Sequence, residues 1–334
     1  MRTIRLVLCG VGGVGRNMVR VSRERPGIAI VAAYSRDPKL LGQDVGELAG
    51  GDPTGVRVTE RAEALSTPAH ALLIASTSFL RDVETDIRSG IDAGLDVICT
   101  AEEMAYPWEV DRATADSLDA AARAAGVTVI GAGANPGYIY EVVGLALTGA
   151  VWRVDRIAVR RVVDLSGFSA GVQRRLGIGF DPATFSEKVR DHLVFGHIGF
   201  PHTIRTFGHR LGVTVERIEE TVEPILADHP ITSTAVAVAP GESAGLHQRT
   251  TGIVAGEPWF SAEFIGHVEP AAAGLEPKDS YEIDGLPNVR AVVSPGFNPQ
   301  WTTAGALANI LPLVIDARPG LISVTDLPIP TPWT

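Results

Sequence analysis

A turn of closely spaced glycines gives the clearest chemical signal in this sequence. Residues 10–15 read Gly10-Val-Gly12-Gly13-Val14-Gly15 and fit the pattern GxGxxG directly after an apolar run. Gly10 would allow the tight bend, Gly12 the close approach of a pyrophosphate, and Gly15 the packing of a helix on a sheet. The N-terminus of that helix favours phosphate through its N–H groups and dipole. The pattern predicts dinucleotide binding, with a purely structural glycine turn as the alternative.

The residues that follow the second apolar run, 28–34, indicate which dinucleotide the turn would serve. An NAD site typically has Asp or Glu at this point, but the run is followed by Ser35 and Arg36. A hydroxyl beside a planar cation suits the 2′-phosphate of NADP. Asp37 is the acidic group that could instead bind an unphosphorylated ribose. We expect NADP, with NAD as the alternative cofactor and a solvated loop residue as the alternative for Arg36.

Two adjacent carboxylates, Glu102 and Glu103, are the leading candidates for catalysis. An apolar run ends at Thr100, and Ala101 leads into the pair. Open parallel sheets bind ligands at the carboxyl ends of their strands, so the pair is expected beside the cofactor. A carboxylate in a dry cleft has a raised pKa and can transfer protons or hold an ammonium group. A solvated helix start with two glutamates is the alternative.

Small hydroxyl residues follow another apolar run of the same kind. The run 69–75 continues into Ser76, Thr77 and Ser78. At the carboxyl end of a sheet strand, Ser76 and Thr77 would line the cofactor cleft. The same residue types are also preferred N-caps of helices, so both interpretations stay open.

Apolar runs that alternate with helix-like segments must position these candidates. The sequence predicts strands over 4–9, 28–34, 69–75, 96–100 and 127–131, and helices over 16–25, 80–93 and 109–125. This alternation is typical of an α/β fold with a doubly wound parallel sheet. We therefore expect an NAD(P)-binding Rossmann domain over residues 1–135.

The pattern changes after Asn135-Pro136-Gly137. Strands are expected over 156–164, 248–254, 259–268 and 291–294, with helices near 181–193 and 203–211. Mixed and alternating faces predict an α+β domain with an open, mixed, largely antiparallel sheet over residues 136–300, for substrate binding and dimerisation. Residues 301–334 are expected to form a helix, over 303–315, and an extended Pro-rich tail that return to the Rossmann domain.

Composition and charge exclude several classes of function. The 334 residues are 45% hydrophobic and 20% charged, with a formal net charge of -10. An acidic chain without a Lys/Arg-rich run is not expected to bind nucleic acid, and no apolar stretch approaches the roughly 20 residues that span a bilayer. The N-terminal run is typical of a strand rather than a secretion signal. Cys9 and Cys99 fit a reducing compartment, so a cytoplasmic protein is expected.

Two motif-like patterns are not expected to carry chemistry. The histidines at 192, 197 and 202 are five residues apart, with His209 beyond, and this spacing does not place them on one helical face as metal ligands. No metal site is therefore expected. The segment 241–245 matches the GxSxG of serine hydrolases, but a strand rather than a helix is expected after it. We interpret this segment as a loop.

Several longer segments together resemble one known family. They are 100–107, 131–137, 161–164, 196–199, the pair Thr302-Thr303 with Asn309, and 317–321. These segments are similar to the 2,4-diaminopentanoate dehydrogenase family, which includes the native amine dehydrogenases. The first domain is more distantly similar to dihydrodipicolinate reductase and homoserine dehydrogenase. The resemblance implies reversible oxidative deamination, in which an amine, NAD(P)⁺ and water give a ketone or aldehyde, ammonia and NAD(P)H.

The resemblance also implies roles for individual residues. One glutamate of the pair would bind the ammonium and move protons as the iminium forms or hydrolyses, and Glu102 is preferred because it lies nearer the strand end. The expected cofactor-binding positions outside the glycine turn and the ribose end are Ser76, Thr77, Thr100, Ala101, Asn135, Thr303 and Asn309. The expected substrate pocket contains Tyr138, Arg161, Phe168 and His197. A homodimer is expected by family analogy.

Some alternatives stay open. Arg161 would bind a carboxylate if the substrate is an amino acid such as 2,4-diaminopentanoate, or it would pair structurally with Asp164. A reductase of a cyclic imine would share the first domain, although the glutamate pair stands where dihydrodipicolinate reductase has a Thr-Thr-Gly-type loop. A non-catalytic NADPH sensor is the alternative from another class. The expected partners are therefore a small amine or ketone and ammonia.

Overall fold

The computed structural model describes residues 3–233 and 235–333. By internal packing the chain divides into two compact units. One unit contains the residues up to Val142 together with those from Asn298 onward, and the other is Val143–Phe297. The sequence pattern places the corresponding limits at 135 and 300. Each unit has its own sheet.

The first unit is built on a seven-stranded sheet in the order β15-β6-β5-β4-β1-β2-β3. All neighbouring strands in this sheet are parallel. The strands are β1 (Ile4–Cys9), β2 (Ile28–Tyr34), β3 (Val58–Thr59), β4 (Ala71–Ile74), β5 (Asp96–Cys99), β6 (Thr128–Gly131) and β15 (Gly320–Ile322).

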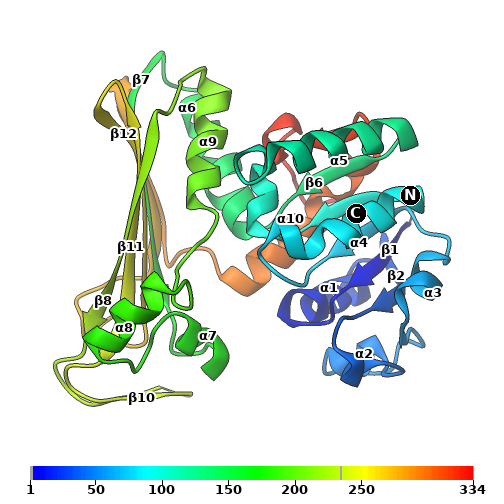
Figure 1. The fold of residues 1–334 in the computed structure, drawn as a ribbon, viewed down its shortest axis with the longest axis horizontal. Coiled ribbons are helices and arrows are strands. Elements are labelled where there is room, and N and C mark those ends of the chain that lie inside the picture. Colours follow the sequence, from blue (N-terminus) through cyan, green and yellow to red (C-terminus); the bar gives the residue numbers. More distant parts are fainter. Residues whose placement is uncertain (1–2, 234, 334) are drawn as a thin grey trace. The chain divides into compact units, whose positions relative to one another are not determined.

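Helices cover both faces of this sheet because its strands are apolar on both sides. In β1, Leu6 and Leu8 join the core with α1 and α10, whereas Val7 and Cys9 join the core with α4 and α5. The helices of this unit are α1 (Gly13–Glu24), α2 (Val45–Leu48), α3 (Arg61–Leu65), α4 (Leu80–Asp92), α5 (Arg112–Ala125) and α10 (Pro299–Ile315) (Figure 1). The predicted Rossmann-type fold is confirmed.

The strands β1 and β2 begin and end where the sequence predicts, and α4 ends one residue early. The first helix starts at Gly13, three residues before the predicted start, because the glycine turn is itself its first turn. β3 and β15 were not predicted. They have two and three residues, too few for a recognisable apolar run.

The second unit contains a six-stranded sheet in the order β14-β13-β7-β12-β11-β8. Only the β7–β12 pair in this sheet is parallel. The strands are β7 (Arg153–Asp164), β8 (Arg217–Leu226), β11 (Ser243–Val254), β12 (Glu257–His267), β13 (Lys278–Leu286) and β14 (Val289–Val293). The short strands β9 (Ile231–Thr232) and β10 (Ala237–Val238) form a separate pair. The expected mixed, largely antiparallel sheet is confirmed.

One helix packs closely against a face of the second sheet. α9 (Phe200–Leu211) runs along the sheet (Figure 1). Its Phe207 packs against Phe260 of β12, with ring centroids 4.8 Å apart. Close packing continues at Gly252 of β11, where an added Cβ would lie 2.5 Å from Ile204. The other helices of this unit are α6 (Leu145–Thr148), α7 (Ala170–Arg175) and α8 (Pro182–Arg190).

The last residues pack within the first unit. Ala304, Leu307 and Leu311 of α10 are buried in the same core as β1. Residues 328–333 have no regular structure, and the Trp333 indole donates to the carbonyl of Ala308 at 2.8 Å. The Trp333 ring also occupies the space beside Gly27, where an added Cβ would be 2.4 Å from it.

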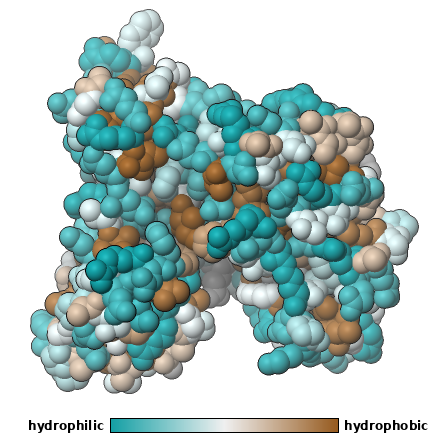
Figure 2. All heavy atoms as spheres, viewed as in Figure 1, coloured by the Kyte–Doolittle hydropathy of each residue, from teal (hydrophilic) through white to brown (hydrophobic). Residues whose placement is uncertain are grey.

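The surface is mixed in polarity. On the face shown in Figure 2, hydrophilic side chains are spread over both units with hydrophobic ones scattered between them. Among the described residues, none of the helices is long and apolar enough to cross a membrane.

The packing of the glycine turn generates the first prediction. A Cβ at Gly15 would lie 2.1 Å from the carbonyl oxygen of Gly10, and this backbone contact cannot rotate away. Gly15→Ala should therefore lower the free energy of unfolding by about 1–3 kcal/mol, as expected for overpacking. Urea denaturation followed by circular dichroism measures the change.

Gly13→Ala is the matched control, because its Cβ would meet nothing within 4 Å on the same helix. Its stability should equal or exceed that of the wild type, since Ala favours a helix. Equal stability of the two variants would contradict the close approach at Gly15.

Candidate functional site

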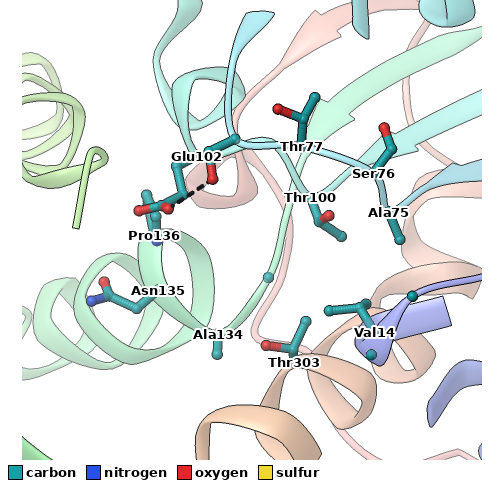
Figure 3. A pocket seen from close by; sticks show the side chains of 14 residues that line it. Val14, Ala75, Ser76, Thr77, Thr100, Glu102, Ala134, Asn135, Pro136 and Thr303 are labelled. Carbon is teal, nitrogen blue, oxygen red and sulfur yellow. Dashed lines mark hydrogen bonds between the residues drawn. The ribbon is translucent and has the colours of Figure 1, made fainter. Parts of the chain in front are cut away.

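A pocket opens at the carboxyl edge of the first sheet (Figure 3). Its volume of about 360 Å³ falls in the range of small-molecule sites. The lining comes from the ends of β1, β4, β5 and β6 and from α10. The lining residues are Gly12, Gly13, Val14, Ala75, Ser76, Thr77, Ser78, Thr100, Glu102, Gly133, Ala134, Asn135, Pro136 and Thr303.

The glycine turn forms one wall of this pocket. Gly10 has φ +93°, and an added Cβ there would lie 2.5 Å from the carbonyl oxygen of Ala75. Gly10 and Gly15 therefore let β1, β4 and α1 approach each other, while Gly12 and Gly13 line the pocket itself. No side chain caps the N-terminus of α1 at Gly12. This combination of a narrow turn and an uncapped helix start suits a pyrophosphate.

The two adjacent glutamates point to different places. Glu102 lines the pocket, and its Oε1 accepts a hydrogen bond from the Ser78 hydroxyl at 3.1 Å (Figure 3). Glu103 is not a lining residue, and its Oε2 accepts from the backbone N–H of Leu80 at 2.6 Å. The backbone N–H of Glu103 also donates to the carbonyl of Ser78 at 3.2 Å. The loop ending at Ser78 thus holds both glutamates in place.

Glu103 takes over the capping of α4. The residue at the N-cap position, Phe79, has no side chain that can cap, so the carboxylate of Glu103 supplies the acceptor for Leu80. Burial raises the pKa of Glu103, although the Leu80 hydrogen bond and the nearby Arg81 act in the opposite direction. Both glutamates also lie in the first turn of the short helix Glu102–Ala105, as the helix-start alternative expects, and Glu103 in addition caps α4.

Ser76 and Thr77 line the pocket rather than cap α4. The N-cap of α4 is Phe79, so the N-cap interpretation of the hydroxyl run is wrong. Thr77 donates to Asp82 of α4 at 3.2 Å. Ser78 was not selected from the sequence, although it continues the same run of hydroxyl residues that the strand end exposes.

Asn135 brings an unusual side chain to the pocket. Both its amide nitrogen and its amide oxygen are buried and have no hydrogen-bond partner in the protein. The residue lines the pocket beside Pro136 (Figure 3). A buried polar group without a partner is costly, so these two atoms fit a ligand that both accepts and donates, such as a carboxamide. Across the pocket, Thr303 also lines the wall and donates to the Pro299 carbonyl at 2.9 Å.

The residues predicted to bind the adenosine ribose of the cofactor, Ser35, Arg36 and Asp37, lie after β2 and outside the pocket lining. Ser35 Oγ accepts from the N–H of Asp37 at 3.1 Å, and Asp37 itself accepts from the N–H of Lys39 at 3.0 Å. Asp37 therefore caps the short helix Pro38–Leu40. Arg36 Nη2 contacts Asp86 Oδ2 at 2.6 Å, and the Arg36 side chain is 43% exposed, so it is both paired and in contact with solvent.

Two cofactor candidates lie outside the pocket lining. Asn309 accepts a hydrogen bond from Arg25 at 2.7 Å and is not a lining residue. Asn309 follows Thr303 by six positions, which turn a helix by roughly 600°, so the two side chains leave α10 in different directions. Ala101 is buried at the start of the short helix Glu102–Ala105, where its N–H faces the Cys99 sulfur at 3.5 Å.

Arg161 and His197 lie in the second unit near a common carboxylate. Arg161 Nη1 pairs with Asp279 Oδ1 at 2.9 Å, both side chains being buried, and Arg161 Nη2 donates to the carbonyl of Phe297 at 2.7 Å. Burial raises the pKa of Asp279, while the charges of Arg161 and His197 act to lower it. The His197 ring lies 4.7 Å from that of Phe264, which is the register partner of Arg161.

The predicted pairing of Arg161 with Asp164 is wrong. Residues three apart in a strand point to opposite faces, so the two side chains of β7 cannot meet. Asp279 is the register partner of Arg161 across the antiparallel β7–β13 pair and lies on the same face. Asp164 instead accepts from the N–H of Ser166 at 2.8 Å.

The remaining pocket candidates are in separate segments. Tyr138 belongs to the first unit, and its N–H donates to the carbonyl of Gly133 at 2.9 Å. Phe168 belongs to the second unit, in the turn after β7, where its carbonyl accepts from Gln173 at 3.1 Å. Both side chains are half-buried.

The patterns set aside on sequence grounds have structural roles. Ser243 is fully buried at the start of β11 and donates to the Gly245 carbonyl at 2.8 Å, so its hydroxyl is not accessible to a substrate as a nucleophile would be. Burial raises the pKa of Cys9 and of Cys99 to about 12, which keeps both thiols protonated. Over residues 3–233 and 235–333, no group of three or more His, Cys, Asp or Glu side chains could hold a metal ion.

Known protein families match both parts of the chain. Residues 138–334 match the 2,4-diaminopentanoate dehydrogenase C-terminal domain, and residues 4–78 match the dihydrodipicolinate reductase N-terminus. The chain is 30% identical to the 2,4-diaminopentanoate dehydrogenase of Acetoanaerobium sticklandii, over 99% of this chain and 95% of the relative. It is 25% identical to an amine dehydrogenase of Streptomyces virginiae, over 98% of this chain and 96% of the relative.

A solved structure gives the same result. The amine dehydrogenase from Mycobacterium smegmatis is similar to this chain with a TM-score of 0.85 and 28% identity, over 97% of this chain and 96% of that one. The similarity therefore extends through both units rather than the nucleotide-binding sheet alone.

The capping role of Glu103 generates a prediction on pH and stability. Because its pKa is raised in the folded protein, the folded state binds the proton more tightly than the unfolded chain. The stability that the proton contributes is therefore complete below the unfolded pKa of about 4.3 and is lost as pH rises through the raised folded value. Glu103→Gln should flatten this part of the pH–stability curve, measured by urea denaturation between pH 4 and 8.

The control at Glu103 separates the hydrogen bond from the charge. Gln retains an oxygen that can accept from Leu80, whereas Glu103→Ala removes it and should cost about 1 kcal/mol, as for the loss of a helix cap. A wild-type pH dependence in Glu103→Gln would contradict the raised pKa.

The buried ion pair generates a second prediction. Arg161→Met leaves Asp279 buried without its cation and should lower the free energy of unfolding by about 3–5 kcal/mol. Adding Asp279→Asn should recover much of this loss, because the uncompensated charge is then removed. Chemical denaturation of the single and double variants measures both changes.

Arg160→Met is the control, since the neighbouring Arg160 points to the other face and its pair with Glu263 is half-exposed. It should change stability by at most about 1 kcal/mol. Similar small losses in Arg160→Met and Arg161→Met would argue against a structural role for the Arg161–Asp279 pair.

Proposed function

Because this chain belongs to the 2,4-diaminopentanoate dehydrogenase family, we propose that it is an amine dehydrogenase in which Glu102 is the catalytic carboxylate. In the reaction, a protonated amine, NAD(P)⁺ and water give a ketone or aldehyde, ammonium, NAD(P)H and a proton, and the reverse direction is reductive amination. The observation that carries the assignment is that Glu102 lines the pocket while Glu103 caps α4.

The position of Glu102 explains what a carboxylate would do there. It lies in the same pocket as the glycine turn, at the edge where parallel sheets bind ligands. A negative charge in a partly enclosed pocket attracts the ammonium group of an amine and stabilises the positive charge of the iminium. The same carboxylate can accept a proton when water adds to the iminium carbon. The Ser78 hydroxyl would hold Glu102 Oε1 in place during these steps.

The residues around the pocket fit a nicotinamide dinucleotide. The turn at Gly10–Gly15 leaves room that side chains would fill, and the uncapped start of α1 suits the pyrophosphate. Asn135 has an unpartnered donor and an unpartnered acceptor in the pocket, which match the carboxamide of a nicotinamide. When bound, the nicotinamide would take up or return the hydride. The protein's part is orientation and charge.

Two observations at the end of β2 support NADP as the preferred form. Arg36 is held by Asp86 and is half-exposed beside Ser35, as a 2′-phosphate site requires. Asp37, the residue that could bind an NAD ribose, is engaged in capping the next short helix. NAD is the alternative cofactor, and comparing NADPH with NADH in the activity assay distinguishes the two.

The substrate is a small amine or the matching carbonyl compound with ammonia. A second candidate, an amino acid such as 2,4-diaminopentanoate, is favoured by the 30% identical relative of that name. The dihydrodipicolinate reductase N-terminal model matches residues 4–78, and a 4-hydroxy-tetrahydrodipicolinate reductase matches 59% of the chain. The 2,4-diaminopentanoate dehydrogenase matches 99% of the chain, and this wider similarity favours an amine over a cyclic imine. The extent of similarity to dehydrogenases through both units argues against a non-catalytic sensor. A homodimer and a cytoplasmic location stay predictions.

The proposal is tested by the activity of Glu102→Gln. This variant should lower ammonia-dependent NAD(P)H oxidation on a panel of small ketones and 2-amino-4-oxopentanoate by at least about 100-fold, because proton transfer and charge stabilisation are both lost. NADPH binding, followed by fluorescence titration, should remain close to that of the wild type.

Glu103→Gln is the matched control on the neighbouring residue and should retain most of the activity. If Glu102→Gln turns over normally, or if Glu103→Gln alone is inactive while still folded, the assignment of Glu102 is wrong. Activity restricted to 2-amino-4-oxopentanoate would favour the amino-acid enzyme over the simple amine dehydrogenase.

A further inference from the structure

The buried carboxylate of Asp86 on α4 contacts two arginines, Arg36 and Arg61, whose common placement no other described feature explains. Asp86 is 3% exposed. Its Oδ1 accepts a hydrogen bond from the Tyr34 hydroxyl at 3.1 Å and lies 3.5 Å from Arg61 Nη1. Its Oδ2 accepts from Arg36 Nη2 at 2.6 Å. A buried carboxylate with several donors is a rigid anchor for their side chains.

The two arginines come from the same edge of the sheet. Arg36 follows β2 and Arg61 follows β3 at the start of α3. β2 and β3 are parallel neighbours, with Tyr34 paired to Thr59. Both arginines therefore leave the carboxyl edge side by side, at the end of β2 where dinucleotide-binding folds place the adenosine ribose.

The charges at this point do not cancel. Two guanidinium groups share a single buried carboxylate, so one positive charge remains in excess. The arginine side chains are 43% and 46% exposed, whereas the Asp86 side chain is 4% exposed. Burial alone would lower the pKa of Arg36, but the hydrogen bond to Asp86 and the negative charges of Asp86 and Asp82 together outweigh it, so the pKa is raised and the cation stays charged. The exposed sides of both guanidinium groups are in contact with solvent.

We propose that Arg61 is a second phosphate-binding residue that, together with Arg36, recognises the 2′-phosphate of NADP and determines the preference for NADP over NAD. The inference rests on the proposed dinucleotide-binding function. Asp86 fixes the two guanidinium groups at a common point, so their outward N–H groups can converge on one dianionic phosphate. Such bidentate recognition is the geometry in which arginine surpasses lysine.

The test compares the two cofactors in Arg61→Gln. Loss of one charge-assisted contact should raise KM for NADPH about tenfold, while KM for NADH stays near the wild-type value. Arg36→Gln should act in the same direction, and the double variant should abolish discrimination between NADPH and NADH. Steady-state kinetics with one ketone and saturating ammonia provide these values.

Arg88→Gln is the matched control. Arg88 is an arginine of α4 that pairs with Glu84 one turn earlier, so the variant makes the same charge change without touching Asp86. Its NADPH and NADH constants should both equal those of the wild type. An equal loss in Arg88→Gln would show that net charge alone, rather than Arg61, attracts the phosphate, and would overturn the proposal.

A binding measurement separates this inference from the proposed amine chemistry. Adenosine 2′,5′-bisphosphate and 5′-AMP, titrated by calorimetry, report on the 2′-phosphate without any turnover. Arg61→Gln should weaken the bisphosphate about tenfold and leave 5′-AMP unchanged. Unchanged bisphosphate binding would refute the role of Arg61 even if amine turnover is observed. If the protein distinguishes the bisphosphate from 5′-AMP as expected but does not turn over an amine, only the proposed reaction is refuted.

Discussion

The hydrogen bond between the Leu80 N–H and the Glu103 carboxylate decides how the candidate site is arranged. α4 begins without a capping side chain of its own, and one of two adjacent glutamates supplies the missing acceptor. Once Glu103 is held there, the backbone of the short helix Glu102–Ala105 directs Glu102 into the pocket. Ser78 then holds Glu102 from the side of β4. The N-terminus of α4 thereby selects which of the two carboxylates meets a ligand.

The sequence predicts the first half of the fold well because its signals are local. β1 is apolar except for Arg5 and ends before Gly10, and β2 is apolar and begins after Pro26-Gly27. The GxGxxG turn needs its glycines for contacts that the structure shows at Gly10 and Gly15. The strands β8 and β13 were missed for the opposite reason. β8 has a largely exposed face rich in Glu, and β13 alternates charged residues with Tyr281 and Ile283. Their identity as strands depends on neighbours far along the chain.

The partners of the site residues were the least predictable part. Arg161 meets Asp279, 118 residues away, because β7 and β13 pair in a register that no local pattern specifies. The two glutamates look equivalent in the sequence, and only the placement of α4 separates them. Asp86 and Arg61 carried no sequence signal at all, since an Asp within an amphipathic helix and an Arg at a helix start are ordinary surface residues. Burial of Asp86 against Tyr34 gives both residues their significance.

Charge distribution connects the two ends of the proposed cofactor site. The chain has a formal net charge of -10, so a polyanionic dinucleotide approaches against an unfavourable overall potential. Binding must then depend on local positive groups: the uncapped start of α1 for the pyrophosphate, and the excess charge of Arg36 and Arg61 beyond β2. The proposed catalytic end needs the opposite sign, because an ammonium or iminium would be held there, and the carboxylate of Glu102 lines the pocket at that end. The strand order places these two ends apart, since β2 and β5 lie on opposite sides of β1 and β4 in the sheet. A single parallel sheet thus separates a cationic subsite from an anionic one, which is what a ligand with a phosphorylated ribose at one end and a cationic reaction centre at the other requires.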